Sequence, residues 1–401
     1  MEQVKRKQND YSKGSISKAI LGLAGPLAAA QFMNILYNLI DRMYLGRMPE
    51  IGRLALTGVG ITFPIIAILT AFANLFGMGG SPLVSMARGK GDIKEAEHVM
   101  GNAFSMLVIV SLLIPLIIQI FKEPILYFLG ASADTIGYAK EYITIYMCGT
   151  IFSSLGIGMN PYINCQGFGR TGMLTIALGA VINTVLDPLF IFVFDMGVRG
   201  AALATVISQF CSMVWVLRFL TGRKALVRLH LQNLRLRART ILDILSLGVS
   251  NFIMSFTTGL VQMVCNSTLQ SMGGDLYVSV MTVINSFREI AFVPVTALSN
   301  GAAPVIGFNS GAREYDRIRK AIRFTCFVAL TCSTVIWLII SLFPGVFIRI
   351  FNSDPALLSA GIPAFRIYFA AYLFMGFQTT GQVTFLAIGR AKAAIFFSLL
   401  R

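Results

Sequence analysis

The sequence predicts an all-α polytopic membrane protein made of two parallel six-helix lobes. Hydrophobic residues make up 56% of its 401 residues, charged residues make up 13%, and the mean hydropathy is +0.73. Because roughly a quarter of the residues in an ordinary soluble domain are charged, this composition excludes that class. An internal repeat with an offset of 222 residues then indicates two homologous lobes in one chain.

The repeat is clearest where residues 80–96 recur as residues 302–318. Gly89 lies 222 positions before Gly311, and the prolines within the two segments keep the same offset. The chain is therefore divided into an N-terminal six-helix lobe, a basic cytoplasmic interlobe loop and an incomplete C-terminal lobe, which cover residues 1–220, 221–240 and 241–401.

Ten apolar runs are long enough to cross a hydrocarbon layer roughly 30 Å thick as helices of about 20 residues. These runs cover residues 17–44, 54–78, 99–121, 136–159, 172–194, 201–220, 241–270, 276–300, 322–343 and 365–388. An eleventh begins near Ala393, where the repeat places the fifth helix of the second lobe. We expect twelve helices in the intact protein and a chain that lacks most of helix eleven and all of helix twelve; a natural re-entrant end is the alternative.

Lysine and arginine are concentrated in the N-terminal segment, the interlobe loop and the other loops on the same side of the predicted bundle. Short cytoplasmic loops retain these residues, so the N-terminus is predicted to be cytoplasmic. The net charge of +15 indicates topology and contact with lipid headgroups, because no soluble domain organises the basic residues for nucleic acid. For the interlobe loop we weigh a simple linker against an amphipathic segment on anionic lipid, and favour the linker.

Metal and disulfide chemistry finds no support in the sequence. The six cysteines have no CxxC spacing, and the two histidines have no paired-ligand spacing. The G-x-x-x-x-G-K-[ST] phosphate loop is also absent, so transport would have to draw on an ion gradient. An ion-coupled carrier needs ionisable or oxygen-rich groups inside the membrane, where a carboxylate is costly. Only three acids qualify as such groups inside the membrane: Asp41, Asp187 and Glu289.

Asp41 shares one helical face with two polar residues. Asn34 and Tyr37 lie seven and four positions before it, and Asn38 lies at the margin of the face. Pro26 in the same run is expected to free a backbone carbonyl and to permit a kink. The competing interpretation is that Asp41 only caps the outer end of its helix.

Asp187 is supported in a similar way by Asn183, one helical turn before it. Pro188 follows directly and is expected to free the carbonyl near Thr184. Burial in an apolar bundle disfavours the charged form of a carboxylate. If Asp187 and Asp41 face one cavity, they could therefore exchange protons near physiological pH. The alternative is that Asp187 only pins helices together.

The third acid, Glu289, follows Arg288 in the middle of an apolar run. Adjacent residues on a helix point about 100° apart, so the two need not pair with each other. They either line a polar cavity or form structural pairs between helices. The candidate substrate-cavity residues in the second lobe are Gln262, Asn266, Arg288, Glu289, Gln378 and Gln382.

Four motifs resemble those of the multidrug and toxic compound extrusion (MATE) transporters, in the bacterial DinF-like branch. They are Asn38-Leu-Ile-Asp41, Gly80-x-Pro82 with Ala87-Arg-Gly89, Asn183-x-x-x-Asp187-Pro188, and Gly301-Ala-Ala-Pro304-Val-Ile-Gly307-Phe-Asn309-Ser-Gly311-Ala312-Arg313. The resemblance covers the whole chain, and the last motif is the most specific. It implies a twelve-helix antiporter whose two lobes form a V and which exports organic cations and other amphipathic compounds in exchange for protons or sodium ions.

The resemblance also implies roles for single residues. In the DinF-like branch the coupling ion is placed on acids of helices one and five. Asp41 and Asp187 occupy those motif positions here, Asn183 matches the accompanying amide, and Pro26 matches the proline at which helix one is thought to bend. Other branches use acids in helices seven and ten, where this chain has none beyond Asp243 at the start of helix seven. Coupling in the N-terminal lobe is therefore expected.

Taken together, we expect a secondary active multidrug efflux antiporter that is not an enzyme, needs no cofactor and couples to H⁺ or Na⁺. Its expected partners are small amphipathic or cationic solutes and the lipid bilayer, not nucleic acid, and we expect a monomer in the bacterial cytoplasmic membrane. The alternative is a lipid-linked oligosaccharide flippase of the same superfamily, which usually has more cationic residues in its cavity. An intramembrane enzyme is less favoured, because no HExxH or G-x-S-x-G motif is present.

Overall fold

Helices account for every regular element in the described part of the chain. The computed structural model describes residues 10–48, 52–351 and 355–399. Its α-helices are α2 (Ile16–Gly46), α3 (Gly52–Gly89), α4 (Ile93–Ile120), α5 (Lys122–Phe128), α6 (Ile136–Cys148), α7 (Thr150–Asn164), α8 (Gly169–Pro188), α9 (Gly197–Thr221), α10 (Ala238–Gly311), α11 (Tyr315–Leu342), α12 (Pro344–Phe351), α13 (Pro355–Phe369), α14 (Met375–Ala387) and α15 (Ala391–Leu399). Shorter turns are the π-helix η1 (Leu189–Val193) and the 3₁₀-helices η2 (Leu231–Leu234) and η3 (Tyr372–Phe374).

The ten predicted apolar runs are all helical, which confirms the predicted all-α membrane protein. Nine helical segments in the described residues are long and apolar enough to cross a membrane, and α6 with α7 forms a tenth span that is bent by 59°. The bend lies at Gly149, where a Cβ atom would come within 2.5 Å of the Val206 side chain. The close approach of α9 therefore favours glycine at the bend, and no sequence pattern indicated this packing.

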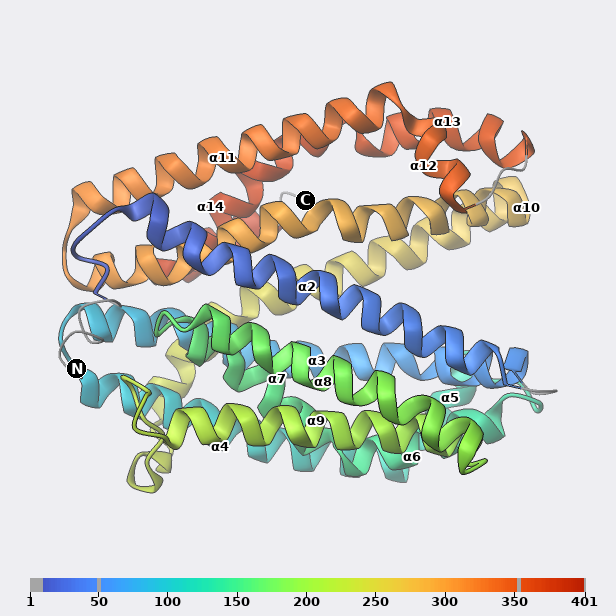
Figure 1. Ribbon diagram of the computed structural model, residues 1–401, viewed down its shortest axis with the longest axis horizontal. Coiled ribbons are helices and arrows are strands. Elements are labelled where there is room, and N and C mark those ends of the chain that lie inside the picture. The colour runs from blue at the N-terminus through green and yellow to red at the C-terminus, as the bar shows by residue number, and fades with distance from the viewer. Residues whose placement is uncertain (1–9, 49–51, 352–354, 400–401) are drawn as a thin grey trace.

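Element α10 contains two of these spans, Ala238–Thr258 and Ser279–Gly311. Arg288 Nη2 lies 3.4 Å from Gln262 Oε1, although 26 positions separate the two residues. In a straight helix that separation would be about 39 Å at 1.5 Å per residue. The helix must therefore double back, and Figure 1 shows its yellow first part running to the right and its orange second part returning.

Figure 1 shows two groups of helices, with α3 to α9 below and α10 to α14 above. Helix α2 lies between them and packs on α8 of the lower group and on α10 of the upper group. Helices α3 and α10 also pack against each other. Contacts between segments far apart in the sequence thus join the two groups.

The repeated glycines form a symmetric contact between the two groups. A Cβ atom at Gly89 would lie 1.9 Å from the carbonyl oxygen of Phe308, and a Cβ atom at Gly311 would lie 1.9 Å from that of Met86. Met86 and Phe308 are themselves 222 positions apart, so each repeat presents the same two positions to the other. We call this contact the glycine seam. It lies where α3 joins α4 and α10 joins α11, at the left of Figure 1.

The start of the described chain crosses the upper helices at the same end of the molecule. The carbonyl oxygen of Tyr11 accepts hydrogen bonds from Asn309 Nδ2 at 3.1 Å and from Arg317 Nε at 3.0 Å. The Tyr11 ring meets the Phe308 ring edge-on, with 5.8 Å between ring centroids. Residues 10–15, here called the N-terminal clasp, are thus tied to the glycine seam.

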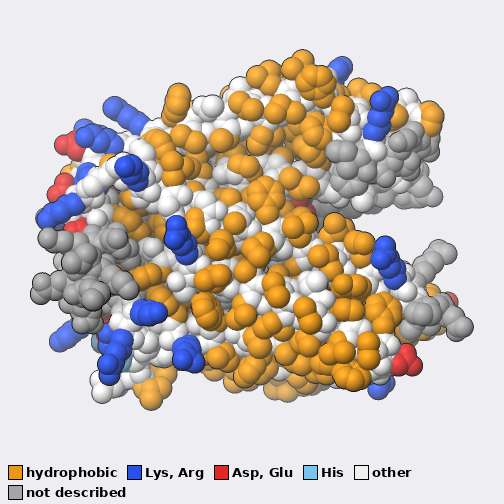
Figure 2. Space-filling view, in the orientation of Figure 1, with side chains coloured by type: hydrophobic (Ala, Val, Ile, Leu, Met, Phe, Trp, Pro, Cys, Tyr) orange, Lys and Arg blue, Asp and Glu red, His pale blue; other side chains and the backbone are white. Residues whose placement is uncertain are grey.

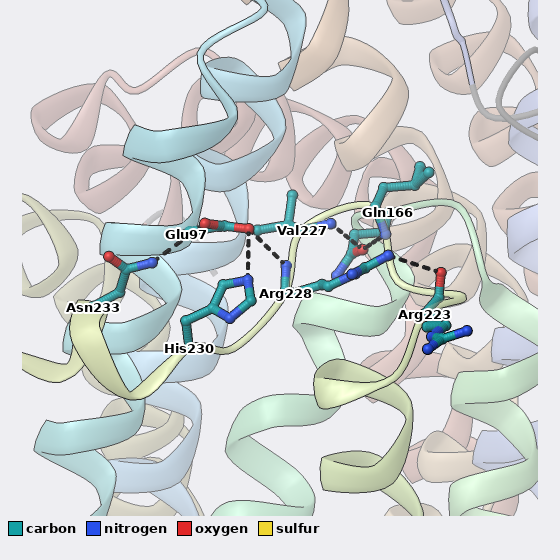
Figure 3. A network of polar contacts seen from close by, with 8 residues as sticks. Glu97, Gln166, Arg223, Val227, Arg228, His230 and Asn233 are labelled. Atoms are coloured by element: carbon teal, nitrogen blue, oxygen red, sulfur yellow. Dashed lines mark hydrogen bonds and ion pairs between the residues drawn. The ribbon is translucent and has the colours of Figure 1, made fainter.

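The basic interlobe loop, residues 221–240, is folded against the lower group. Glu97 of α4 accepts a hydrogen bond from Asn233 Nδ2 at 3.3 Å and lies 3.5 Å from His230 Nε2 (Figure 3). Gln166 Oε1 accepts two backbone N–H groups of the loop at 2.8 and 2.9 Å. These contacts give the loop a fixed path and fit its interpretation as a linker.

Hydrophobic and charged side chains occupy different zones of the surface, as in a membrane protein. On the face shown in Figure 2, hydrophobic side chains cover the middle, while lysine and arginine gather mainly at the left end and less at the right end. The molecule is hollowed at the right, between the upper and lower groups. The glycine seam lies at the opposite end, so the two groups meet on the left and part on the right (Figure 1).

Candidate functional site

Two buried carboxyl groups from different helices meet inside the lower group. Asp41 lies near the end of α2 and Asp187 in the last turn of α8, with 8% and 0% of their surfaces exposed. The two carboxyl groups are close neighbours. Asn183 Nδ2 donates to Asp187 Oδ1 at 3.2 Å and to Thr205 Oγ1 of α9 at 3.4 Å. These four residues, here called the acid-pair site, bring three helices to one polar centre.

The acid-pair site has oxygen atoms available for a cation. Asp41 Oδ1, Asp187 Oδ2 and Asn183 Oδ1 are buried and have no hydrogen-bond partner in the protein. Across the described residues, no ion pair includes either aspartate. Adjacent carboxylates repel each other when both are charged, and hard cations prefer oxygen ligands. The arrangement can therefore hold a proton or a sodium ion between α2 and α8.

Three tyrosines surround the site, and sequence reasoning found only one of them. Tyr37 and Tyr142 both lie close to Thr205 and to Asp41. Tyr146, next to them, accepts a hydrogen bond from Gln209 Nε2 at 3.3 Å. The residues that sequence reasoning missed are Tyr142 and Tyr146 on α6 and Thr205 and Gln209 on α9. Helical spacing reveals only neighbours on the same helix, so no sequence signal connected them to the aspartates.

Several predicted residues lie at the edge of the site or outside it. Asn38 is exposed, and its Nδ2 donates to the backbone carbonyl of Asn34 at 2.8 Å. Thr184 is half-buried, one position after Asn183. Helix α2 runs through Pro26 without interruption, so a kink at this proline would not break the helix. After Pro188, α8 gives way to the π-helix η1, which agrees with the expected disturbance of the backbone bonding.

A cavity of about 400 Å³ lies beside the acid-pair site, between the two groups of helices. Tyr37 connects the cavity with the acid-pair site, because it lines the cavity and neighbours Asp41. Side-chain amides provide much of the polar lining: Gln31, Asn34, Asn74, Asn160, Asn164, Gln209, Asn251 and Asn300. None of the described residues that line the cavity is a lysine, arginine, aspartate or glutamate. The cavity therefore offers hydrogen bonds and apolar surface, and the nearby charge is on the acid pair.

A second cavity of about 350 Å³ continues from the first along α3. The two share Asn74, and the second is lined by Phe63, Ile66, Ala67 and other residues of α3 together with Ser255 of α10. The space between the two groups therefore extends along α3.

The candidate cavity residues on α14 do not line either cavity. Gln378 Nε2 donates to the backbone carbonyl of Phe397 at 2.7 Å, and Gln382 Nε2 donates to Asn251 Oδ1 at 3.4 Å. The next residue, Val383, does line the larger cavity. One residue turns a helix by about 100°, so the sequence located the correct helix but the wrong side of it.

The described candidates on the two arms of α10 are not among the residues that line either cavity. Arg288 donates through Nη1 to the Tyr368 hydroxyl at 3.1 Å and through Nη2 to Gln262 at 3.4 Å. Glu289 is exposed and has no ion pair within the described part of the chain. The side chain of Asn266 lies outside the described residues.

The sequence matches an established family over most of its length. The MatE family model matches residues 26–189 and 251–401. The chain belongs to the MatE family. It is 23% identical to the multidrug export protein MepA of Staphylococcus saprophyticus over 98% of this chain and 86% of that protein. For MepA of Staphylococcus haemolyticus the identity is 24%, over 97% and 85%. A crystal structure of MATE in the bent conformation superposes with a TM-score of 0.91 at 23% identity, covering 98% of this chain and 86% of that one.

Family membership confirms the predicted resemblance and fold. MATE proteins are transporters, so the chain is a multi-pass membrane transporter and not an enzyme. The assignment to the DinF-like branch stays a prediction, because these relatives do not distinguish branches. The roles of the acid-pair site and of the cavity are likewise matters for proposal.

Proposed function

We propose that the protein is a secondary active antiporter that exports small amphipathic or cationic compounds, and that a proton or sodium ion bound at the acid-pair site drives it. The MatE match and the multidrug export proteins among its relatives support the reaction class. The observation that carries the coupling mechanism is the buried contact between Asp41 and Asp187 beside a cavity large enough for a drug-sized solute.

Electrostatics explains why a cation would change the conformation. Two like charges about 4 Å apart repel each other by on the order of 4 kcal/mol at an effective dielectric constant of 20. A bound cation removes this repulsion and allows α2 and α8 to approach. Asp41 is attached to α2, which also carries Tyr37 of the cavity wall. Occupation of the acid-pair site therefore moves or fixes one wall of the cavity.

The same linkage gives the exchange its direction. A cation that enters from outside favours the cavity shape that has released its solute, and loss of the cation inside restores the shape that accepts one. We place the N-terminus and the glycine seam on the cytoplasmic side, as the distribution of lysine and arginine indicates. The hollow at the other end then opens to the outside, and the structure represents an outward-facing conformation.

A flippase for lipid-linked oligosaccharides is not favoured. Its substrates carry phosphate groups, which proteins usually bind with arginine and lysine. The described residues that line the larger cavity include neither. The amide-rich wall suits solutes that are bound through hydrogen bonds and apolar contacts.

Asparagine substitution of either aspartate tests the proposal. Asp41→Asn and Asp187→Asn keep the size and polarity of the side chain but remove the charge that binds the cation. We expect ethidium accumulation in everted membrane vesicles to fall to the level of vesicles without the protein, while the amount of protein in the membrane stays normal. The matched control is Asp243→Asn, because Asp243 is exposed near the start of α10. Export by both variants at the rate of the control would refute the proposal.

A further inference from the structure

The upper group contains an arginine that forms no ion pair with any described residue. Arg288 lies within the apolar span Ser279–Gly311 and is half-buried. Its two contacts at hydrogen-bonding distance are neutral acceptors, the Tyr368 hydroxyl and Gln262 Oε1. Its guanidinium carbon also lies 6.0 Å from the centre of the Phe292 ring. Ion pairs between described residues do not include Arg288. An arginine at such a depth is costly and marks a functional site by default.

The repeat relates this arginine to the surroundings of the acid pair and the cavities. At the offset of 222, Arg288 corresponds to Ile66, which lines the second cavity. Tyr368 corresponds to Tyr146, which lies beside the acid-pair site, and Gln262 adjoins the position that corresponds to Asp41. The partners of Arg288 in the second half thus correspond to positions around the acid-pair site in the first half. The first half has two acids in this region, and the second half has an arginine.

We propose that Arg288, oriented by Tyr368 and Gln262, binds the carboxylate of amphipathic solutes that enter the space between the two groups of helices. A guanidinium has five N–H donors in a planar fork that matches a carboxylate. The two neutral acceptors occupy one donor on each of Nη1 and Nη2 and leave other donors free. They hold the fork in place without cancelling its charge. This inference deepens the proposed function, on which it rests, by assigning a residue that binds the carboxylate of its substrates.

The neighbouring acid and the lipid headgroups are weaker candidates for the anion. Glu289 is adjacent in sequence, and side chains at adjacent helical positions diverge by about 100°. Arg288 is also the middle residue of the apolar run 276–300, twelve positions or about 18 Å from either end at 1.5 Å per residue. A lipid phosphate at the membrane surface would have to sink by that distance to reach it.

Binding of two matched dyes tests the inference. Tetramethylrhodamine has a free carboxyl group and is a zwitterion, whereas its methyl ester is a cation of nearly the same shape. Fluorescence anisotropy would report the affinity of each dye for the full chain in lipid nanodiscs. We expect Arg288→Gln to weaken binding of the free acid about tenfold, because it removes a charge-assisted contact, and to leave the ester within about twofold. The control Arg349→Gln makes the same chemical change at an exposed position and should alter neither affinity.

Other results of the dye-binding experiment would also support or overturn the role of Arg288. Equal losses for both dyes, or no loss for either, would overturn the proposal, because Arg288 would then only tie α10 to α13. If Arg288→Gln does not fold, Arg288→Lys carries the test: it keeps the charge, loses the fork, and should give a smaller loss that is still confined to the free acid.

Nanodisc composition separates a solute carboxylate from a lipid phosphate. Loss of the Arg288→Gln effect in discs rich in phosphatidylglycerol would assign the site to lipid and overturn the proposal, whereas an effect that persists would support it. The assay uses no ion gradient. A failure of coupled transport would therefore leave the dye preference intact and can be told apart from a failure of this inference.

Discussion

At the scale of single residues, the acid-pair site shows what a sequence can and cannot locate. Asp41, Asp187 and Asn183 were found because acids inside apolar runs are rare and because spacing places an amide one turn away. Thr205 and Tyr142 were missed because they come from α9 and α6, and only the packing of helices brings them to the aspartates. The charge of the site could thus be predicted, and its full ligand set could not.

The hydroxyl of Thr205 should tune cation affinity without being essential. Thr205→Val removes an oxygen that lies 3.4 Å from Asn183 Nδ2. A neutral hydrogen bond contributes about 1 kcal/mol, so the cation concentration for half-maximal export should rise roughly fivefold. Thr205→Ser should restore the normal value. Thr221→Val, at an exposed position on the same helix, is the control, and an identical shift in that variant would contradict the assignment.

The N-terminal clasp should contribute no pH dependence near neutrality. Partial burial raises the pKa of Asp10, but hydrogen bonds from Ser12 and the charges of Lys13 and Arg317 outweigh it and hold the pKa below its usual value. A lowered folded-state pKa gives stability that is present above the unfolded value of about 4 and is lost as the pH falls further. Asp10→Asn should therefore leave the pH profile of export between about pH 5 and 8 unchanged, and a flattened profile in this variant would contradict the account.

At the scale of elements, hydropathy identified the ten predicted spans, and it missed the bend between α6 and α7. That bend depends on contacts with another helix, whereas the π-helix η1 follows Pro188, where a disturbance was expected. The glycine seam was visible as a repeated motif, although nothing in the sequence indicated that Gly89 and Gly311 each pack against the opposite repeat. Periodicity predicts which face of a helix is apolar, and it leaves open which helix covers that face.

The glycine seam should control closure at its end of the molecule. In Gly89→Ala the new Cβ atom would lie 1.9 Å from the Phe308 carbonyl oxygen, so the two groups must separate there. Spin labels at the exposed positions Lys94 and Lys320 should report a longer distance than in the parent protein. Gly60→Ala, on the same helix with no atom within 4 Å of the added Cβ, is the control. An unchanged distance in Gly89→Ala would show that the seam does not hold the closed end.

At the scale of the whole molecule, the repeat describes the scaffold and the chemistry departs from it. The offset of 222 relates the two glycines of the seam, whereas Asp41 corresponds to position 263, where the second half has methionine. Composition and the repeat predicted the fold class. The cavity could not be predicted, because residues from seven helices line it and one residue of helix rotation decides which side chains enter.

Imposed ion gradients test the central claim most directly. Everted vesicles that contain the parent protein, Asp187→Asn or Asp243→Asn would be given either an acid-inside pH gradient or a sodium gradient that is high inside, and ethidium accumulation would be followed. If the acid-pair site couples transport, at least one gradient accelerates accumulation by the parent and by Asp243→Asn, and Asp187→Asn abolishes the acceleration. Accumulation that responds to neither gradient, or that responds equally in Asp187→Asn, would contradict coupling at the acid-pair site.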